Sequence, residues 1–321
     1  MIRGDNIKLK NYAPKLMDEL LGLGYFRSGK SMFHSPVTFI EGVANSTIRT
    51  RLQLDNHKLS KRTRKLLAKN NRIFTHEIVP LELTDEILEL YKIYKKECFK
   101  GSLNGELHEW LEGSFENEIF NTQMCKIYHE GELVAASFID LGLVSMASIM
   151  GIYHPDYSSY SLGIYSMLVE VEYAKEFGLE FYYPGYILSA SSRFEYKKKV
   201  GNLMYKSFDS LQWEELSKLN KENYFVEKTL SRLNEAKDSL ADMDIESELY
   251  AYPLFTWSTY PMDASLLEQY FFLRVSVELF DTLNIIVVYD IKQDGYRIQL
   301  VNTIGKASAT WKEFKLSLIH I

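Results

Sequence analysis

Residues 154–197 read HPDYSSYSLGIYSMLVEVEYAKEFGLEFYYPGYILSASSRFEYK, and this stretch decides the fold of the chain. Apolar residues recur at helical spacing from Ser161 onward and Gly178 supplies a stop, so the pattern predicts a helix over 161–178. The aromatic-rich run LEFYYPGY at 179–186 predicts the strand that follows this helix.

The residues before this stretch predict antiparallel strands. MCKIYHEGELVAASFIDLG at 124–142 predicts a hairpin that turns at Glu130 and Gly131, and VSMASIMGIYHP at 144–155 predicts a third strand. The order hairpin, strand, loop, helix and diverging strand resembles the plan of the GNAT acyltransferase fold. We therefore expect residues 81–210 to form a GNAT-like catalytic domain, with a mixed, mainly antiparallel sheet flanked by helices.

The predicted helix start at Ser161, Leu162 and Gly163 suits a phosphate group. Its first backbone N–H groups lack partners and carry the positive end of the helix dipole, and Gly163 would let a ligand approach the backbone closely. The alternative is that Ser161 only caps the helix and Gly163 packs against a strand. Ordinary GNAT enzymes bind acyl-CoA with an Arg/Gln-x-x-Gly-x-Gly/Ala loop, whereas residues 158–163 read SSYSLG and lack that glycine pattern.

Residues 1–80 predict an N-terminal α/β unit. YAPKLMDELLGLG at 12–24 predicts a helix with a glycine stop. STIRTRLQLD at 46–55 alternates like a strand, which puts Arg49 and Arg51 on one face.

A basic helix is predicted over residues 60–72, SKRTRKLLAKNNR, with Ser60 as its N-cap. From position 51 to position 72 there are eight Lys and Arg residues and one acid, Asp55. A solvated face is the common meaning of such a run, but this density favours contact with a nucleic acid. The net charge of −6 argues against a general nucleic-acid-coating protein, yet one basic stretch can hold a polyanion locally.

The rest of the chain, residues 211–321, predicts a C-terminal α+β extension of unknown role. Cys98 and Cys125 are the only thiols and form no CxxC pair, so we predict no metal site and expect both to be buried small hydrophobes. The polar start MIRGDNIKLKNY has no apolar signal segment, and no apolar run reaches the roughly 18 residues of a membrane span. We expect a cytoplasmic protein that does not enter a membrane.

Residues 154–197 also match a family pattern, D-P-D, S-L-G, then G-L-x-Y-x-Y-L-G-Y-W-I-x-x-S-x-K-M-x-Y-K. The corresponding elements, in order and without gaps, are HPD at 154–156, SLG at 161–163, GL at 178–179, Tyr183, Gly185-Tyr186, Ser191, Arg193 at the position of the pattern's Lys, and Tyr196-Lys197. In these residues the chain resembles the arginyl-tRNA–protein transferases and the bacterial leucyl-tRNA–protein transferases that act on N-terminal Asp and Glu. These families share a GNAT-like C-terminal domain.

The resemblance extends upstream and has clear departures. The family's F-R-x-S-G element is met by FRSG at 26–29, and its spacing of an Arg, a Ser and a basic run is met by Arg51, Ser60, Arg64, Lys65, Lys69 and Asn70. The family's Cys-Pro-x-Cys cluster is absent, because residues 34–36 read HSP. Pro184, Ile187, Arg193 and Phe194 also differ from the family pattern, which leaves the acceptor and the amino acid open.

The resemblance implies transfer of an amino acid of the Arg or Leu type from charged tRNA to the N-terminal amine of a protein or peptide with an acidic first residue. The charged tRNA is a co-substrate, and no cofactor is implied. Phenols can stack on adenine and hydrogen-bond a leaving 3′-oxygen, although core packing explains a tyrosine-rich sheet equally well. Tyr182 and Tyr183 alternate along a strand, so only one of them can face the site.

Each predicted site residue has one expected role. The expected catalytic residues are Tyr183, Tyr186, Tyr196 and Lys197. The expected tRNA-binding residues are Arg62, Arg64, Lys65, Lys69, Ser161, Leu162, Gly163 and Arg193. The expected acceptor-binding residues are Arg27, Ser28 and Arg51.

Three alternatives stay open at this point. The chain could be a GNAT N-acyltransferase that uses acyl-CoA or another small acyl donor. It could instead be a non-catalytic relative that binds tRNA or peptide N-termini. A third alternative is transfer onto a small peptide or metabolite.

Overall fold

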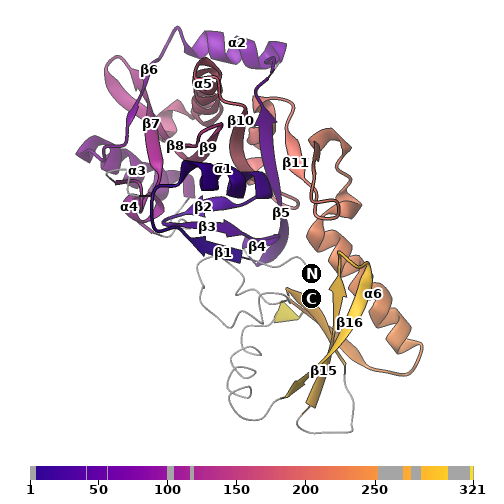
Figure 1. The fold of residues 1–321 in the computed structure, drawn as a ribbon. Helices are drawn as coiled ribbons and strands as arrows, with labels where there is room; N and C mark the ends of the chain where they lie inside the picture. Colours follow the sequence, from indigo (N-terminus) through magenta and orange to yellow (C-terminus); the bar gives the residue numbers. More distant parts are fainter. Residues whose placement is uncertain are drawn as a thin grey trace.

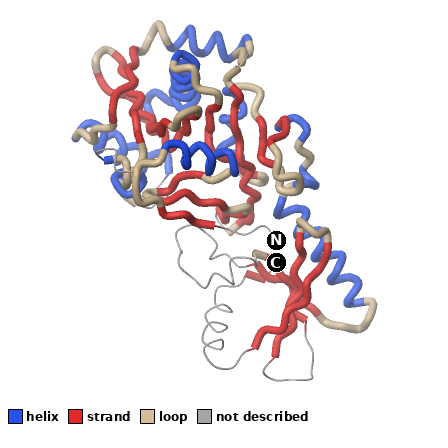
Figure 2. Tube along the Cα trace, in the orientation of Figure 1, coloured by secondary structure: helices blue, strands red, loops and turns tan. Residues whose placement is uncertain are grey.

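The computed structural model shows two α+β units, a larger one formed by the N-terminal two thirds of the chain and a smaller one at its C-terminal end (Figure 1). In the tube view of Figure 2, helices border the strands in both units. The structure describes residues 5–40, 42–55, 57–99, 105–115, 119–251, 270–275, 283–302 and 319–320.

A nine-stranded sheet forms the centre of the larger unit. Its strand order is β12-β11-β5-β10-β9-β8-β7-β6, and β4 pairs with β5 beside this path. The pairs are antiparallel except for β9 with β10, so the sheet is mixed and mainly antiparallel, as predicted. The strands are β4 (Val37–Ile40), β5 (Val43–Gln53), β6 (Thr75–Pro80), β7 (Asn121–His129), β8 (Glu132–Leu141), β9 (Ser145–Tyr153), β10 (Phe181–Leu188), β11 (Met204–Lys206) and β12 (Trp213–Glu215).

Helices cover both faces of this sheet. The helical segments of the larger unit are α1 (Pro14–Leu23), α2 (Lys61–Asn70), α3 (Asp85–Phe99), α4 (Leu107–Trp110) and α5 (Leu162–Glu176), with the 3₁₀ segments η2 (Pro155–Tyr160), η3 (Ser192–Val200), η4 (Leu216–Lys218) and η5 (Lys221–Asn223). On one face Leu21 of α1 packs with Tyr183, and on the other face Val171 of α5 packs with Tyr182. Because Tyr182 and Tyr183 are neighbours in β10, α1 and α5 lie on opposite sides of the sheet. A three-stranded sheet of β1 (Asp5–Lys8), β3 (Ser31–His34) and β2 (Phe26–Ser28) lies beside α1.

Local signals explain where these elements begin and end. Gly24 follows α1 with φ +91°, a left-handed conformation that glycine adopts without strain. Ser60 caps α2, because its side chain accepts a hydrogen bond from Thr63 N at 3.1 Å. Glu130 and Gly131 form the β7–β8 turn with φ of 51° and 89°. The helix stop, the cap and the hairpin predicted from the sequence are therefore confirmed.

The smaller unit packs one helix against a five-stranded antiparallel sheet. Its elements are α6 (Phe225–Ala241), β13 (Ser247–Ala251), β14 (Phe271–Val275), β15 (Leu283–Asp290), β16 (Gly295–Asn302) and β17 (Ile319–His320), with strand order β16-β15-β14-β13-β17. Val37 and Phe208 of the larger unit belong to the same apolar cluster as Phe272 and Leu233 of the smaller one, so a continuous core joins the two units. No helix within the described ranges is long and apolar enough to cross a membrane.

The unit boundaries differ from those expected from the sequence. The expected division at 80/81 falls inside the nine-stranded sheet, because β5 is inserted between β10 and β11 and β6 pairs with β7. The expected division at 210/211 also falls inside this sheet, because β12 pairs with β11. The change from one sheet to the other occurs around the start of α6 at Phe225.

Candidate active site

The candidate site lies where β9 and β10 separate. These strands pair in parallel only through Phe181, Tyr182 and Tyr183 of β10. Pro184 has no N–H to donate to a ladder, and Gly185 has φ +94° at the point where the pairing of β10 with β5 shifts register. The two strands therefore diverge beyond Tyr183 and open the middle of the sheet.

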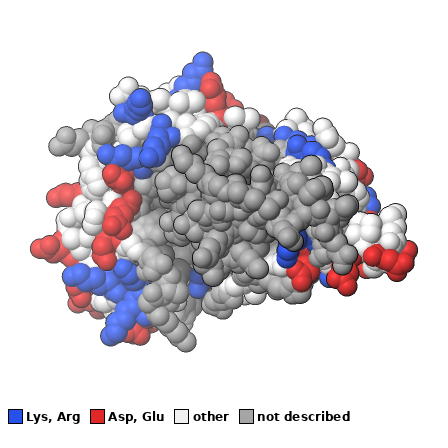
Figure 3. Space-filling model, turned by 90° about the horizontal axis from the view of Figure 1, so that it is seen from below, with Lys and Arg blue, Asp and Glu red and all other residues white. Residues whose placement is uncertain are grey.

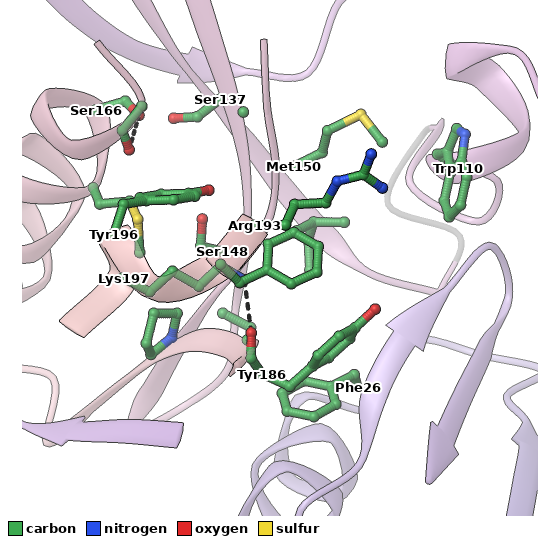
Figure 4. Close-up of a pocket in the computed structure, with 18 of the residues that line it drawn as sticks. Phe26, Trp110, Ser137, Ser148, Met150, Ser166, Tyr186, Arg193, Tyr196 and Lys197 are labelled. Carbon is green, nitrogen blue, oxygen red and sulfur yellow. Dashed lines mark hydrogen bonds between the residues drawn. The ribbon is translucent and has the colours of Figure 1, made fainter. Parts of the chain in front are cut away.

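A cavity of about 1010 Å³ occupies this opening (Figure 4). Its walls come from the diverging parts of β9 and β10, the start of α5, the η3 segment, and β2 with α4. The predicted site residues that line the cavity are Arg27, Ser28, Ser161, Leu162, Gly163, Tyr183, Tyr186, Arg193, Tyr196 and Lys197. The fold thus gathers residues that are far apart in the sequence around one cavity.

Lys197 projects from η3 into this cavity (Figure 4). Its Nζ donates a hydrogen bond to Tyr186 O at 3.4 Å and lies 4.8 Å from the centre of the Phe194 ring. Burial lowers the pKa of Lys197 to about 8, and the nearby carboxyl of Glu170 opposes this effect. A Cβ on Gly185 would come within 2.8 Å of Nζ, so glycine at this position leaves room for the ammonium group.

A buried carboxyl, that of Glu170 in α5, lies behind the cavity wall. It is 0% exposed and accepts hydrogen bonds from Ser137 Oγ at 2.5 Å and Tyr182 Oη at 2.6 Å. The Ser148 hydroxyl is a further hydrogen-bonding neighbour. Burial raises the pKa of Glu170 to about 7, although these hydrogen bonds and the charge of Lys197 lower it. Ser137 and Ser148 both line the cavity, so two hydroxyls separate Glu170 from it.

The start of α5 borders the cavity with an uncapped end. Ser161 has φ +56° and its side chain makes no capping hydrogen bond. No heavy atom lies within 4 Å of the position that a Cβ on Gly163 would take, so Gly163 packs against no strand. The alternative of a simple N-cap with a packed glycine is therefore wrong. Leu162 as a whole is 1% exposed and belongs to the core, which argues against the predicted contact of this residue with tRNA.

The basic helix α2 connects two segments that border the cavity. Asn70 Nδ2 donates to Tyr160 O in η2 at 2.8 Å, and Thr63 Oγ1 donates to Lys199 O in η3 at 3.2 Å. Lys69 Nζ lies 5.4 Å from the centre of the Tyr160 ring. In Figure 1 the helix lies across the end of α5. The predicted tRNA-binding residues of α2 are therefore next to the predicted phosphate site at the start of α5.

The outer face of α2 is exposed and positively charged. Arg62, Arg64 and Lys65 are exposed, and none of them has a carboxylate within ion-pair distance among the residues that the structure describes. The face seen in Figure 3 differs, because there the described Lys and Arg side chains are interspersed with Asp and Glu. A strong local positive field thus belongs to the α2 side of the molecule.

This region is similar in sequence to known transferases. A sequence profile described as "Arginine-tRNA-protein transferase, C terminus" matches residues 86–205, which include β7 to β10, α5, η3 and most of the cavity lining. The part of the chain that forms most of the cavity is therefore similar to the C-terminal part of these transferases.

Individual proteins are also similar to this chain. An aspartate/glutamate leucyltransferase of Leptospira interrogans is 30% identical over 154 residues, which are 46% of this chain and 59% of that protein. An aspartate/glutamate leucyltransferase of Shewanella putrefaciens is 28% identical over 186 residues, 58% of this chain and 77% of that protein. The chain therefore spans about 59% of the length of the Leptospira relative. Among solved structures, that of FemX aligns with a TM-score of 0.40 and 10% identity, over 63% of this chain and 69% of that one.

The predicted role of Arg27, a residue of the family pattern, is wrong. We expected it to bind the acceptor, but its side chain is buried and every nitrogen of its guanidinium donates a hydrogen bond inside the protein. The acceptors are Gly29 O, Glu112 O, the Ser114 and Thr122 hydroxyls, and both carboxylate oxygens of Asp140. Arg27 also lies 4.0 Å over the Phe120 ring. With no donor left for a ligand, Arg27 fixes β2 to the large sheet instead of binding substrate.

Arg51 also lies away from the position we expected. Its guanidinium carbon lies 4.4 Å from the ring centre of Phe181 and 4.5 Å from that of Trp213, on the α1 side of the sheet. It does not line the cavity, and it reaches the cavity only through its hydrogen bond with Tyr183. The prediction of direct acceptor binding by Arg51 is therefore wrong, and Ser28 is the only one of the three expected acceptor-binding residues left with room for a ligand.

The three tyrosines of the family pattern all line the cavity. Burial raises the pKa values of Tyr186 and Tyr196 to about 12, and it also raises that of Tyr183. Their phenols thus stay protonated near neutral pH and can donate hydrogen bonds. Tyr182 lies on the other face and bonds to Glu170, which confirms the predicted alternation of Tyr182 and Tyr183.

Glu170, Ser137 and Ser148 were not predicted as site residues from the sequence. A signal for Glu170 was present, because the helix MLVEVEYA is apolar on nearly all sides and a carboxylate within it must be buried. No comparable signal marks the two serines, which become neighbours only when β8 and β9 pair. In the described part of the chain no group of three His, Cys, Asp or Glu side chains could hold a metal ion.

Proposed function

We propose that this protein transfers an amino acid of the Arg or Leu type from charged tRNA to the N-terminal amine of a protein or peptide with an acidic first residue. One observation carries the proposal. The basic helix α2 is hydrogen-bonded to η2 and η3, two segments that border the cavity. The names of the relatives, aspartate/glutamate leucyltransferases, support an acidic acceptor.

The tRNA is proposed to bind along α2 and to reach the cavity at the start of α5. Arg62, Arg64, Lys65 and Lys69 supply the positive charge that a phosphate backbone requires. The unpaired N–H groups near Gly163 then suit a phosphate or ribose oxygen of the 3′ end. An aromatic ring such as that of Tyr186 can stack on the terminal base.

The chemistry needs positioning more than activation, because an aminoacyl-tRNA is already an activated ester. Orientation alone can lower such a barrier by about 7–11 kcal/mol. The ammonium of Lys197 lies in the cavity and forms no ion pair with a carboxylate of the described residues, so it can stabilise the negative charge that develops on the ester carbonyl oxygen. The phenols of Tyr186 and Tyr196 can donate hydrogen bonds to the leaving ribose oxygen.

The charge of the cavity suits an acidic acceptor. Arg193, Lys197 and Lys199 line it from η3, and Glu109 is the only described acid in the lining. Since Arg27 is fully engaged elsewhere, we propose that η3 provides the cation that the acceptor side chain meets. In this proposal the acceptor is recognised by η3, the segment that also carries Lys197, and not by β2 as we expected from the sequence.

A labelled-transfer assay tests the proposal. The protein is incubated with tRNA charged with labelled Leu or Arg and with peptides that begin with Asp, Glu, Asn or Gln. We expect ribonuclease-sensitive incorporation into the Asp and Glu peptides and much less into the matched amides, which lack only the charge. Substitution of Lys197 by Met keeps the length of the side chain and should lower the rate while tRNA binding persists.

Other outcomes would overturn the proposal. Consumption of acetyl-CoA without tRNA would identify an ordinary N-acyltransferase. Tight binding of charged tRNA with no transfer to any peptide would identify a binding protein. Transfer onto free amino acids or small amines in preference to peptides would identify a different acceptor class.

A further inference from the structure

Glu170 is a buried acid without a structural partner of opposite charge. Its carboxylate is 0% exposed in the middle of α5, and within the described ranges no Lys, Arg or His comes within ion-pair distance of it. An ionised carboxylate in such a place is costly, so groups of this kind are rare unless they are used. A glutamine or a leucine would fill the same space without this cost.

Two hydroxyl groups donate hydrogen bonds to the carboxylate, and a third hydroxyl is its neighbour. Ser137 Oγ in β8 and Tyr182 Oη in β10 donate to its two oxygens at 2.5 and 2.6 Å. The Ser148 hydroxyl in β9 is a hydrogen-bonding neighbour of both Glu170 and Tyr182. All three hydroxyls come from strands β8, β9 and β10, near the point where β9 and β10 separate. The carboxyl therefore lies directly behind the cavity wall that Ser137 and Ser148 form.

Ser148 connects this network to the cavity. Ser137 is 1% exposed, whereas Ser148 is partly exposed and lines the cavity beside Tyr196 and Lys197 (Figure 4). A proton can thus pass from a group bound in the cavity to Ser148 Oγ while the Ser148 proton passes to Glu170.

We propose that Glu170 takes up the proton that the acceptor amine releases, and that it does so through the hydroxyl of Ser148. The inference rests on the proposed function, because it assigns a proton pathway to that reaction. Glu170 itself touches no substrate. Its part is to hold a proton during the transfer and to return it.

The proton balance of the step is simple. The neutral amine attacks the ester carbonyl carbon, and a C–N bond forms. One amine proton moves to Ser148 Oγ as the Ser148 proton moves to the Glu170 carboxylate. The ester C–O bond then breaks, the proton returns along the same path to the ribose oxygen, and Glu170 is again a carboxylate. The products are the amide and the free ribose hydroxyl.

The charged and titratable groups around Glu170 favour this role. Lys197 in η3 favours its ionised form, while Tyr196 in η3, Tyr182 in β10 and Cys125 in β7 are neutral neighbours whose own pKa values are raised. Burial brings the pKa of Glu170 to about 7, so the carboxylate is present above this pH and can be protonated near it. A base that titrates near the working pH is the most effective kind.

The test is the pH profile of single-turnover transfer from preformed aminoacyl-tRNA, measured between about pH 5.5 and pH 8.5 on wild type and three variants. Wild type should show a rate that rises through about pH 7. Glu170→Gln keeps the shape of the side chain and should lose this limb, with a rate lower by about 10²-fold, the smaller end of general acid–base effects. Ser148→Ala should behave in the same way, and tRNA affinity should not change in either variant.

Tyr182→Phe separates the proposal from the titration of the acceptor amine. The Tyr182 hydroxyl stabilises the Glu170 carboxylate, so its removal should move the limb to higher pH, whereas the pKa of the peptide amine cannot respond to this substitution. Glu170→Gln with the wild-type rate and profile would overturn the inference. If that variant does not fold, an unshifted limb in Tyr182→Phe would overturn it. A wild-type protein that transfers nothing would instead refute the proposed function, which is a different result.

Discussion

The buried ion pair between Arg27 and Asp140 provides the sharpest test of the difference between a structural and a substrate-binding arginine. The Arg27 Nη1 lies 2.7 Å from Asp140 Oδ1, and both side chains are 1% exposed. Replacement of Arg27 by Met removes the guanidinium and leaves the Asp140 carboxylate buried without its cation. Removal of one partner from such a pair costs about 3–5 kcal/mol.

The expected loss is large enough to measure by urea unfolding. With a urea dependence of about 2–3 kcal/mol per M, the midpoint of the larger unit should fall by about 1–2 M in Arg27→Met and by a similar amount in Asp140→Asn. The double variant should lose less than the sum of the two, because each single variant already removes the same interaction. Arg232, a solvent-accessible residue paired with Glu235 and Asp294, is the control, and Arg232→Met should move the midpoint much less than Arg27→Met does.

A different pattern would refute the reasoning about Arg27. If Arg27 bound the acidic acceptor, Arg27→Met would raise KM for the peptide and leave unfolding almost unchanged. A loss of less than about 1 kcal/mol together with additive effects of the two single variants would show that the pair does not hold β2 to the sheet.

Three further predictions follow from the site. Because the folded-state pKa of Glu170 is raised to about 7, the free energy of unfolding should fall as pH rises from about 4.5 to 7. In urea unfolding, Glu170→Gln should remove about 3 kcal/mol of this pH dependence, and an equal pH dependence in both proteins would contradict the prediction. Reversal of charge at Arg62, Arg64 and Lys65 should weaken tRNA binding and reduce its salt dependence by about 0.7–0.9 in slope per lost phosphate contact; unchanged binding in filter assays would rule out α2. Gly185→Ala should abolish most transfer because φ is +94° and the new Cβ would approach the η3 ammonium, and a normal rate would show that this ammonium is dispensable.

Most elements of the fold could be predicted from the sequence because their signals are local. The hairpin turn at Glu130, the cap at Ser60 and the helix stop at Gly178 each depend on a few neighbouring residues. The unit boundaries could not be predicted, since β5 is inserted between β10 and β11, which follow it by more than a hundred residues. Strand order of this kind depends on long-range packing, which leaves no local trace.

The candidate site was predictable in part for the same reason. The family pattern located Tyr186, Tyr196 and Lys197, which the fold then brings to one cavity. The pattern could not separate a residue that contacts substrate from one that fixes the scaffold, as Arg27 illustrates. Glu170 was not predicted because its hydrogen-bonding neighbours belong to three different strands, which come together only in the folded sheet.

The two hydrogen bonds that tie α2 to η2 and η3 have a consequence for how the substrates influence each other. The helix has ten residues and is about 15 Å long, and it is fastened near one end to Lys199 and at the other to Tyr160. An RNA that stiffens α2 would also stiffen both margins of the cavity, so a peptide entering afterwards would lose less conformational freedom. Because such coupling is reciprocal, the bound peptide must raise the affinity for the RNA by the same factor. In the proposed function, a protein of this kind would bind aminoacyl-tRNA more tightly when an acceptor peptide is present than when it is absent.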